Sequence, residues 1–494
     1  MQGSRSSGSS IAPGATRGSS SGRPTATSTS WSRMTASSAP SADLAAMPLP
    51  PGPPLPATLQ TLLWIMRPLG FMEACRERYG DVFSVRFAGL GLGRTIVFVA
   101  DPEGIRAVFA ASPDDLRAGD ANAPLQAILG ENSLLMLDGR EHLRQRRLIV
   151  PPFHGERMRR YEELMRDVTH EQIRTWPRQQ ALAILPAMQR ITLEVILRAV
   201  LGFDEGAERD RMRTLLQRML RLGSGSAQLA SMAFLPIELG GATTWGRFVR
   251  AKRDVDAALI AQAARRRAAG TAGHDDVLSL LLDARDDDGR PLTDDELRDE
   301  LITLLVAGHE TTATALAWAL DLVLHHPDVH ARVVLAAEEG DTRYLDAVTK
   351  ETLRIRPVVP IVVRRLHKPF TVLQHELPVG TVVAPCIYLT QRRPDVYPEP
   401  QRFRPERFLE GAPDTYAWLP FGGGVRRCVG ASFASFEMRV VLQTMFESLH
   451  LRAGAPDFDG TTRRAVTLVP RHGVPVVIDG QRSRPSELSA AVPA

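Results

Sequence analysis

A helical pattern of unusual length runs from Thr293 to His326. It opens with a capping box, because Glu296 lies three residues after Thr293 and each side chain can bond the backbone N–H of the other residue. It closes at Pro327, which has no backbone N–H and cannot continue a helix. At about 1.5 Å per residue such a helix is about 50 Å long, far above the average. We expect it to cross a large, mainly helical domain.

The rest of the chain predicts a single mainly α domain with a small β region, over residues 47–480. Residues 81–89 (DVFSVRFAG) and 94–100 (RTIVFVA) alternate apolar side chains and are separated by glycines, which predicts a β-hairpin. Amphipathic helical stretches follow between about residues 140 and 285. The sequence shows no internal repeat and no second change in composition, so its length does not require a second domain.

Residues 1–46 are rich in Ser, Gly and Thr and are too polar to pack, so we expect a disordered tail. A transit peptide is the alternative, but the segment lacks an amphipathic apolar face, which favours a solvated tail or a start at Met34 or Met47. The net charge of +4 equals the four arginines of residues 1–42, which contain no acidic residue, and so gives no indication of nucleic-acid binding. Residues 481–494 are expected to form a flexible C-terminal tail.

The three cysteines, Cys75, Cys386 and Cys428, are too few and too widely spaced for a disulfide framework. Such usage fits a reducing compartment, and we expect a cytoplasmic, monomeric protein. No run of about 18 apolar residues appears, so no membrane-spanning helix is predicted. The best candidate, Leu62–Phe71, is short and is interrupted by an arginine and a proline.

Cys428 lies in the sequence FGGGVRRCVG, residues 421–430, just before an amphipathic helical pattern. Glycines allow close backbone approach and positive φ, and the N–H groups at a helix start favour a thiolate. These residue types suit a cysteine that ligates an iron held in a flat macrocycle, with Phe421 covering the sulfur and Arg426 meeting a carboxylate. A buried structural cysteine beside a glycine-rich turn is the alternative. A phosphate-binding loop is disfavoured because its Lys-Ser/Thr ending is absent.

This loop resembles the haem-binding signature of the cytochrome P450 family, with the signature positions occupied by Phe421, Gly424, Arg426, Cys428 and Gly430. The resemblance covers about residues 48–480. It implies the cytochrome P450 fold and a monooxygenase that uses O2. It also implies that the Cys428 thiolate ligates the iron of haem b, iron protoporphyrin IX.

Residues 307–312 (AGHETT) place a glycine and an acid–alcohol pair inside the long apolar helix, where polar groups need partners. A close helix crossing at Gly308, with Thr311 bonded to a backbone carbonyl, is a purely structural explanation. In the family this motif lies over the haem. The resemblance therefore assigns Ala307 and Gly308 to the cofactor, Thr311 to hydrogen bonding of bound oxygen, and Glu310 to proton delivery. A zinc site is disfavoured because the second histidine of H-E-x-x-H is absent.

Glu351 and Arg354 lie one helical turn apart in KETLRIRP, residues 350–357. Such a pair is most often a surface salt bridge that contributes little to stability. In the family, the same pair is a buried scaffold joined by an arginine of a downstream segment. The resemblance assigns that part to Arg407 in FRPERF, residues 403–408, and makes the trio structural.

A basic helical pattern occupies residues 138–153 (DGREHLRQRRLIVPPF), and such a face is usually only solvated. The family commonly has W-x-x-x-R here, meeting a haem propionate. His142 replaces the tryptophan and Arg146 is in register; a histidine can also donate to a carboxylate. Arg364 matches a further propionate arginine, although the neighbouring Arg365 leaves the register open.

The resemblance implies electrons from a separate ferredoxin or flavodoxin with its NAD(P)H reductase, docked by Arg144, Arg147 and Arg427 on the thiolate face. It implies hydroxylation or epoxidation of a lipophilic small molecule, because the segments that line the family's pocket are largely apolar here. They are residues 121–131, 216–240, 358–363 and 466–468. Short stretches are similar to bacterial fatty-acid and terpenoid hydroxylases, and a polyketide or another secondary metabolite fits as well.

Three other functions stay open at the level of sequence. A family member with non-oxygenase chemistry, such as peroxide-driven oxidation or isomerisation, would not need the Glu310–Thr311 pair. A haem-based sensor would not need a proton relay either. A hydrolase centred on Cys428 would be colourless once purified.

Overall fold

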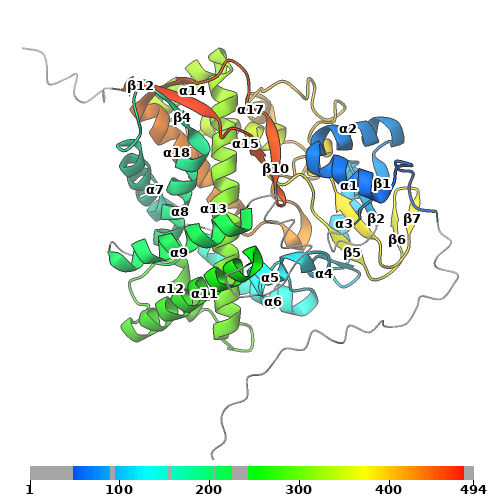
Figure 1. Ribbon diagram of the computed structural model, residues 1–494, viewed down its shortest axis with the longest axis horizontal. Coiled ribbons are helices and arrows are strands. Elements are labelled where there is room, and N and C mark those ends of the chain that lie inside the picture. Colours follow the sequence, from blue (N-terminus) through cyan, green and yellow to red (C-terminus); the bar gives the residue numbers. More distant parts are fainter. Residues whose placement is uncertain are drawn as a thin grey trace, which may run out of the picture. The chain divides into compact units, whose positions relative to one another are not determined.

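The computed structural model describes residues 48–482, apart from residues 89–94, 154, 156, 204–205 and 225–242. The predicted N-terminal tail lies outside these residues, and so does the C-terminal tail after Arg482. In the described part, helices dominate and small sheets lie to one side of them (Figure 1). The predicted fold class, mainly α with a small β region, is confirmed.

The long predicted helix is present as α13, Asp294–Leu324, and runs through the middle of the helical part (Figure 1). Its capping box is formed, because Thr293 Oγ1 accepts from the Glu296 N–H at 3.2 Å and the Thr293 N–H donates to Glu296 Oε2 at 2.8 Å. The next helix, α14 (Pro327–Glu339), begins at the proline that was predicted to end α13.

Helices from both halves of the chain surround α13, and α8 (Ile184–Ala199) crosses it. The other described helices are α1 (Ala57–Met66), α2 (Pro68–Tyr79), α3 (Pro102–Ala110), α4 (Ala118–Ala121), α5 (Gln126–Leu129), α6 (Gly139–Ile149), α7 (Arg157–Ile173), α9 (Ala207–Ser224), α11 (Thr244–Ala269), α12 (Val277–Asp283), α15 (Thr342–Ile355), α16 (Ile387–Thr390), α17 (Arg407–Glu410) and α18 (Ala431–Ser448). Short 3₁₀ helices are η2 (Ala123–Leu125), η3 (Pro151–Phe153) and η5 (Gly424–Arg426). None of the helices within the described ranges combines the length and apolarity needed to cross a bilayer.

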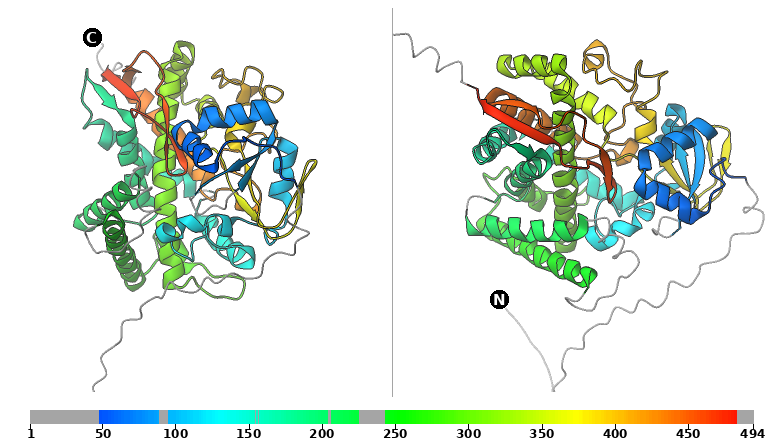
Figure 2. Two further views of the ribbon diagram at one scale, coloured as in Figure 1. Left: turned by 45° about the vertical axis from the view of Figure 1, so that its right-hand side comes forward. Right: turned by 45° about the horizontal axis from the view of Figure 1, so that its top comes forward.

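The predicted hairpin is present, since β1 (Val82–Arg86) pairs antiparallel with β2 (Thr95–Val99). β2 runs parallel to β8 (Val382–Pro385), and β5 (Arg364–Leu366) and β3 (Leu116–Arg117) complete a five-stranded sheet in the order β1-β2-β8-β5-β3. Strands from early in the chain, drawn in blue, and strands from residues 364–385, drawn in yellow, therefore lie side by side, next to the N-terminal helices (Figure 2).

Three smaller sheets lie elsewhere: β4 (Ala181–Ala183) with β12 (Pro475–Gln481) and β9 (Leu449–Ala453), β6 (Phe370–Val372) with β7 (His375–Leu377), and β10 (Thr461–Arg464) with β11 (Thr467–Pro470). The β10–β11 hairpin is tied to its surroundings at Leu468. Its carbonyl accepts from Trp318 Nε1 of α13 at 3.2 Å, and its N–H donates to the Val358 carbonyl at 2.8 Å.

Cys75 and Cys386 lie in an apolar core beside the five-stranded sheet. Burial raises the pKa of the Cys75 thiol to about 11 and that of the Cys386 thiol to about 12. All three cysteines are free in the structure. Cys75 and Cys386 are buried whereas Cys428 is exposed, which leaves Cys428 as the candidate ligand.

One buried carboxyl on α18 predicts a pH-dependent stability. Glu437 is fully buried, its Oε1 has no hydrogen-bond partner within the described chain, and burial raises its pKa to about 8. The folded chain binds the Glu437 proton more tightly than the unfolded chain, in which the pKa of this carboxyl is near 4.5. The contribution of Glu437 to folding stability is therefore fully present below pH 4.5 and is lost as pH rises through 8.

We therefore expect Glu437→Gln to raise the free energy of unfolding at pH 9 by about 3 kcal/mol and to change it little at pH 5. Urea unfolding of the haem-loaded protein at pH 5, 7 and 9 measures this. Glu339→Gln, an exposed carboxyl on α14, is the control and should follow the wild type at all three pH values. Parallel pH profiles for Glu437→Gln and wild type would contradict the prediction.

Candidate functional site

The Cys428 loop connects η5 to α18. The Cys428 N–H donates to the Phe421 carbonyl at 2.9 Å, which closes the loop on itself. Gly422 and Gly424 have φ values of 67° and 63°, a region that side chains disfavour, so the tight turn requires glycine at both positions.

The glycines of this loop also allow a close approach, but to α3. A Cβ added at Gly423 would lie 2.4 Å from Phe109 Cδ2, and one added at Gly424 would lie 2.5 Å from the Phe109 carbonyl oxygen. We predicted that these glycines bring the loop close to a ligand. The structure adds a second use, which is packing of the loop against Phe109, and the approach to a ligand stays a prediction.

The Cys428 thiol lies deep in the fold. Burial raises its pKa, while the Gly430 N–H and the charges of Arg146 and Arg427 act in the opposite direction. The side chain nevertheless keeps solvent-accessible surface, unlike those of Cys75 and Cys386. Cys428 is therefore the cysteine of this chain that a bound group can reach.

Four basic side chains of the same region lie close enough to interact electrostatically. His142 and Arg146 come from α6, Arg364 from β5 and Arg426 from η5. Burial, followed by the charges of Arg426, Arg146 and Arg364, lowers the pKa of His142 to about 3. The His142 ring is buried, and its Nδ1 has no partner among the described residues. The cluster is thus a concentration of positive charge that a bound anion would offset.

Arg364, and not Arg365, belongs to the cluster. Arg364 is buried, and burial together with the charge of Arg426 lowers its pKa to about 10. Arg365 points elsewhere and lies 3.7 Å from Asp120 Oδ2. The register that the sequence left open is therefore resolved in favour of Arg364.

Asp138 is a site residue that the sequence analysis missed. Its carboxylate accepts from the backbone N–H groups of Ala118, Gly119 and Asp120, and it pairs with the guanidinium of Arg426. Arg426 also donates to the Leu134 carbonyl at 2.9 Å. The available signal was an aspartate directly before a basic helix. It was overlooked because an aspartate at that position is usually interpreted as an N-cap.

These residues fit haem b. The accessible sulfur of Cys428 is a soft donor of the kind that ligates haem iron. The cluster of His142, Arg146, Arg364 and Arg426 suits the two carboxylates of iron protoporphyrin IX, because its three arginines are cationic and its neutral histidine can donate a hydrogen bond. The unpartnered Nδ1 of buried His142 adds a polar group that needs a partner.

The middle of α13 presents an open face. Ala307 is exposed although most side chains of the helix are buried, and Gly308 and Thr311 are partly accessible. Gly308 has a second use, because a Cβ there would lie 3.0 Å from Ile196 Cδ1 of α8. His309 faces inward, where burial lowers its pKa to about 4 and its Nδ1 lies 3.1 Å from Thr192 Oγ1. It is thus a packed core histidine.

Glu310 and Thr311 each bond to another residue. Thr311 Oγ1 donates to the Ala307 carbonyl at 2.6 Å, which is the local bond that the sequence left as an alternative. The Glu310 carboxylate accepts from Arg464 Nη1 of β10 at 2.6 Å. Arg464 was missed, because it lies 154 residues along the chain and no local motif marks it.

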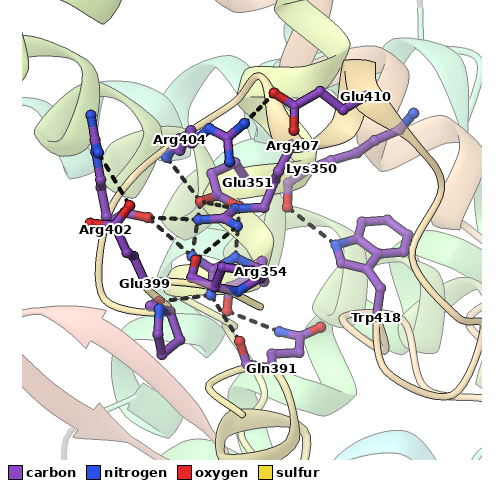
Figure 3. A network of polar contacts seen from close by, with 12 residues as sticks. Lys350, Glu351, Arg354, Gln391, Glu399, Arg402, Arg404, Arg407, Glu410 and Trp418 are labelled. Carbon is purple, nitrogen blue, oxygen red and sulfur yellow. Dashed lines mark hydrogen bonds and ion pairs between the residues drawn. The ribbon is translucent and has the colours of Figure 1, made fainter. Parts of the chain in front are cut away.

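The predicted scaffold trio is assembled and buried (Figure 3). Glu351 accepts from Arg354 Nε at 2.6 Å, from Arg354 Nη2 at 2.8 Å and from Arg407 Nε at 3.0 Å. Arg354 also donates to the carbonyls of Gln391 and Pro400 at 2.8 and 2.9 Å. The alternative of a surface salt bridge is excluded, since the Glu351 and Arg354 side chains are both 0% exposed.

The predicted docking surface needs a correction. Arg144 is bound between Asp286 at 2.6 Å and Glu296 at 2.7 Å, and Arg147 pairs with Asp287. Their charges are already matched by acidic side chains. Arg427, which is exposed beside Cys428, is the member of the predicted set that still presents its charge.

Comparisons with known proteins agree with this geometry. A family model described as Cytochrome P450 matches residues 50–470. The Mycobacterium tuberculosis protein named cytochrome P450 135B1 is 41% identical over 443 residues, covering 88% of this chain and 92% of that protein. Cytochrome P450 137 of the same species is 38% identical over 401 residues, covering 81% of this chain and 83% of that protein.

Two solved structures share the fold. The cyanobacterial CYP120A1 with retinoic acid bound has a TM-score of 0.75 and 26% identity, covering 88% of this chain and 100% of that chain. The haem domain of cytochrome P450DA has a TM-score of 0.77 and 22% identity, covering 88% of this chain and 98% of that chain.

Proposed function

The chain belongs to the cytochrome P450 family of haem-thiolate monooxygenases, which bind haem b, and from this we propose that it oxidises a lipophilic small molecule. The observation that carries the proposal is Cys428, an exposed cysteine that lies close to the charges of Arg146 and Arg427. In the overall reaction one atom of O2 enters a C–H or C=C bond of the substrate. The other atom leaves as water, and two electrons and two protons are consumed.

Haem b supplies the oxidative chemistry when bound, since a thiolate ligand favours cleavage of the O–O bond. The chain supplies the rest. Cys428 provides the thiolate, and the Gly430 N–H and the charges of Arg146 and Arg427 favour its ionised form. Arg146, Arg364 and Arg426 provide positive charge for the cofactor's carboxylates, and the buried His142 ring, which its pKa of about 3 keeps neutral, can donate one hydrogen bond.

Proton delivery is assigned to Glu310 and Thr311 on the open face of α13. Arg464 holds the Glu310 carboxylate in one position, with 17% of that side chain exposed, so a proton from water can reach it. Thr311 Oγ1 is the next oxygen along the helix. In the structure this hydroxyl donates to the Ala307 carbonyl. To act on oxygen, the hydroxyl must rotate so that it donates to a bound molecule beside Ala307.

The substrate is proposed to be lipophilic because the accessible side chains near the site are small and apolar. Ala307 is exposed, Val362 lies beside Gly422 in the Cys428 loop, and Val466 at the tip of the β10–β11 hairpin is exposed. Most of the predicted lining segment 216–240 lies outside the described residues. The solved relative with retinoic acid bound adds a terpenoid acid to the fatty acids, terpenes and polyketides worth testing.

A spectral titration of the haem-loaded protein tests this proposal. Fatty acids, terpenoid acids and macrolides are added separately, and the shift of the main haem absorption band is recorded. Saturable shifts with one lipophilic class support the proposal. Binding of only hydrophilic compounds in a wider panel would overturn the substrate class.

Replacing the hydroxyl of Thr311 should separate oxygen consumption from product formation. We expect Thr311→Ala to leave folding, haem content and substrate binding close to wild type, because one hydroxyl is lost and Ala fits the helix. The product formed per NADPH oxidised should fall by roughly tenfold or more, since a positioned proton donor is lost. Hydrogen peroxide released should rise by the corresponding amount.

Thr311→Ser is the matched control, because it keeps the hydroxyl at the same position and should restore most of the product yield. An unchanged yield in Thr311→Ala would contradict the assigned role. A wild type that turns over only with added peroxide would favour the alternative of peroxide-driven chemistry.

The electrons are proposed to come from a separate ferredoxin or flavodoxin with its reductase. Arg427, exposed beside the Cys428 loop, is the proposed contact for an acidic partner.

A further inference from the structure

A small cavity between α13, the ends of α15 and α16, and the β10–β11 hairpin is lined by two arginines. Arg356 directly follows α15 and Arg392 follows α16, and the lining also includes Trp318 of α13 and Thr461 of β10. The volume open to a water-sized body is about 10 Å³. Such a volume holds one water molecule or one monatomic ion, so the cavity is too small for a phosphate, a sulfate or an organic ligand.

Both guanidinium groups lack an anionic partner. The Nε atoms of Arg356 and Arg392 are buried and have no hydrogen-bond partner among the described residues, and neither arginine forms an ion pair with them. Arg392, which is 8% exposed, uses its other nitrogens on the Ile355 carbonyl, at 2.8 Å, and on Gln401 Oε1. A buried cation without an acceptor for all its N–H groups is costly, so these two side chains require a further acceptor.

The surroundings increase this requirement. Burial is the main cause that lowers the pKa of both guanidinium groups, and the charges of Arg356 and Arg354 lower that of Arg392 further. Two aromatic rings offset part of the cost, since the Arg392 guanidinium lies 4.5 Å from the centre of the Tyr388 ring and that of Arg356 lies 5.4 Å from the centre of the Trp318 ring. The rings also hold the two cations in place beside the cavity.

The carboxylates that act on the two arginines are engaged by other groups. The Asp321 carboxylate, which attracts Arg356, accepts from the Asp459 N–H at 3.4 and 3.2 Å. The Glu73 carboxylate, which attracts Arg392, is exposed and accepts from the Tyr388 hydroxyl at 2.6 Å. The two acids therefore act at long range and leave the Nε groups without an acceptor.

We propose that the cavity binds one chloride ion between the guanidinium groups of Arg356 and Arg392. A guanidinium only donates hydrogen bonds, so a water molecule there would accept from both arginines but would still have to place its own two hydrogens. Other lining side chains, such as Leu69, Ile355 and Leu468, are apolar and accept none. A chloride ion accepts from both arginines and offsets their charge. The proposal does not depend on the proposed function.

The bound anion would join the hairpin to the residues behind it. Leu468 of β11 lines the same cavity, and its carbonyl accepts from Trp318 Nε1 at 3.2 Å. The hairpin also carries Arg464, which holds the Glu310 carboxylate. Chloride therefore stabilises the position of the strand pair on which the orientation of Glu310 depends.

The first test is a chloride titration of the full-length, haem-loaded protein at constant ionic strength, with gluconate as the balancing anion. We expect a saturable rise in melting temperature of about 2 °C or more, because chloride binds the folded chain and not the unfolded one. Arg356→Met should lose this response. In gluconate alone it should melt no lower than wild type, because it removes a buried charge that has no ion pair. Arg402→Met, whose exposed side chain pairs with Glu399, is the matched control and should respond like wild type.

Bromide gives a second measurement, which does not require a variant to fold. Wild-type crystals soaked in bromide should show an anomalous difference peak between the two arginines. Equal chloride responses in wild type and Arg356→Met would overturn the proposal, and so would a cavity that holds water while bromide binds elsewhere. A bromide peak without a chloride response in solution would show binding at crystal concentration only, which also overturns it.

Discussion

Cys428→Ser is expected to abolish the thiolate-type absorption of the reduced carbon-monoxide complex. A serine hydroxyl at this position cannot supply the soft, ionised sulfur that haem iron binds, and the haem content of the purified protein should fall as well. The measurement is the absorption spectrum of reduced protein with and without carbon monoxide, together with haem content.

Cys75→Ser and Cys386→Ser are the matched controls. Both residues are packed in the apolar core beside the five-stranded sheet, and burial raises the pKa of each thiol. Both variants should retain the wild-type absorption even if they are less stable. Loss of the absorption in Cys386→Ser but not in Cys428→Ser would show that the ligand is assigned to the wrong cysteine.

Arg354→Ala is expected to cost about 3–5 kcal/mol of folding free energy, because it leaves the Glu351 carboxylate buried with less of its positive charge. The carbonyls of Gln391 and Pro400 lose their donor at the same time. Since a domain is stable by only about 5–15 kcal/mol, little soluble haem-loaded protein should be recovered. Soluble yield and urea unfolding of the recovered fraction measure this effect.

Arg402→Ala is the control, because its exposed ion pair with Glu399 contributes roughly 1 kcal/mol or less. Arg354→Lys keeps the charge but not the planar fork, so it should also be destabilised, though less than alanine. An Arg354→Ala protein as stable as wild type would show that the buried network is dispensable for the fold.

Features with a local physical cause were predictable from the sequence. The α13 helix follows from a capping box at Thr293 and a proline at 327, and the β1–β2 hairpin follows from alternation between glycines. The Glu351–Arg354 pair has helical spacing, but only the resemblance indicated that it is buried and joined by Arg407. The three-residue spacing of Glu351 and Arg354 fits an exposed pair equally well, because the loops that pack over these two side chains determine whether they are buried.

Features decided by distant segments were not predictable. Arg464 reaches Glu310 because a hairpin near the end of the chain packs over α13. Gly423 and Gly424 are needed because Phe109, more than 300 residues earlier, packs against the loop. Arg144 looked free in a basic sequence, but Asp286 and Glu296 from another part of the chain neutralise it. In each case the deciding neighbour is fixed by tertiary packing and leaves no periodic or compositional signal.

The buried Glu351–Arg354 network also constrains the order in which the chain can be completed. The groups that satisfy these two side chains come from residues 391, 400, 402, 404 and 407, which lie 37 to 56 residues later in the chain. During synthesis, α15 therefore emerges before the partners of its buried charges have been made. These partners are the carbonyls that accept from Arg354 and the guanidinium of Arg407, which pairs with Glu351. Contacts between residues so far apart in sequence form late, because closing the loop between them costs entropy before the contacts stabilise the chain. Since the Cys428 loop follows this segment, capture of the cofactor belongs to the last stage of folding, after nearly the whole chain has left the ribosome.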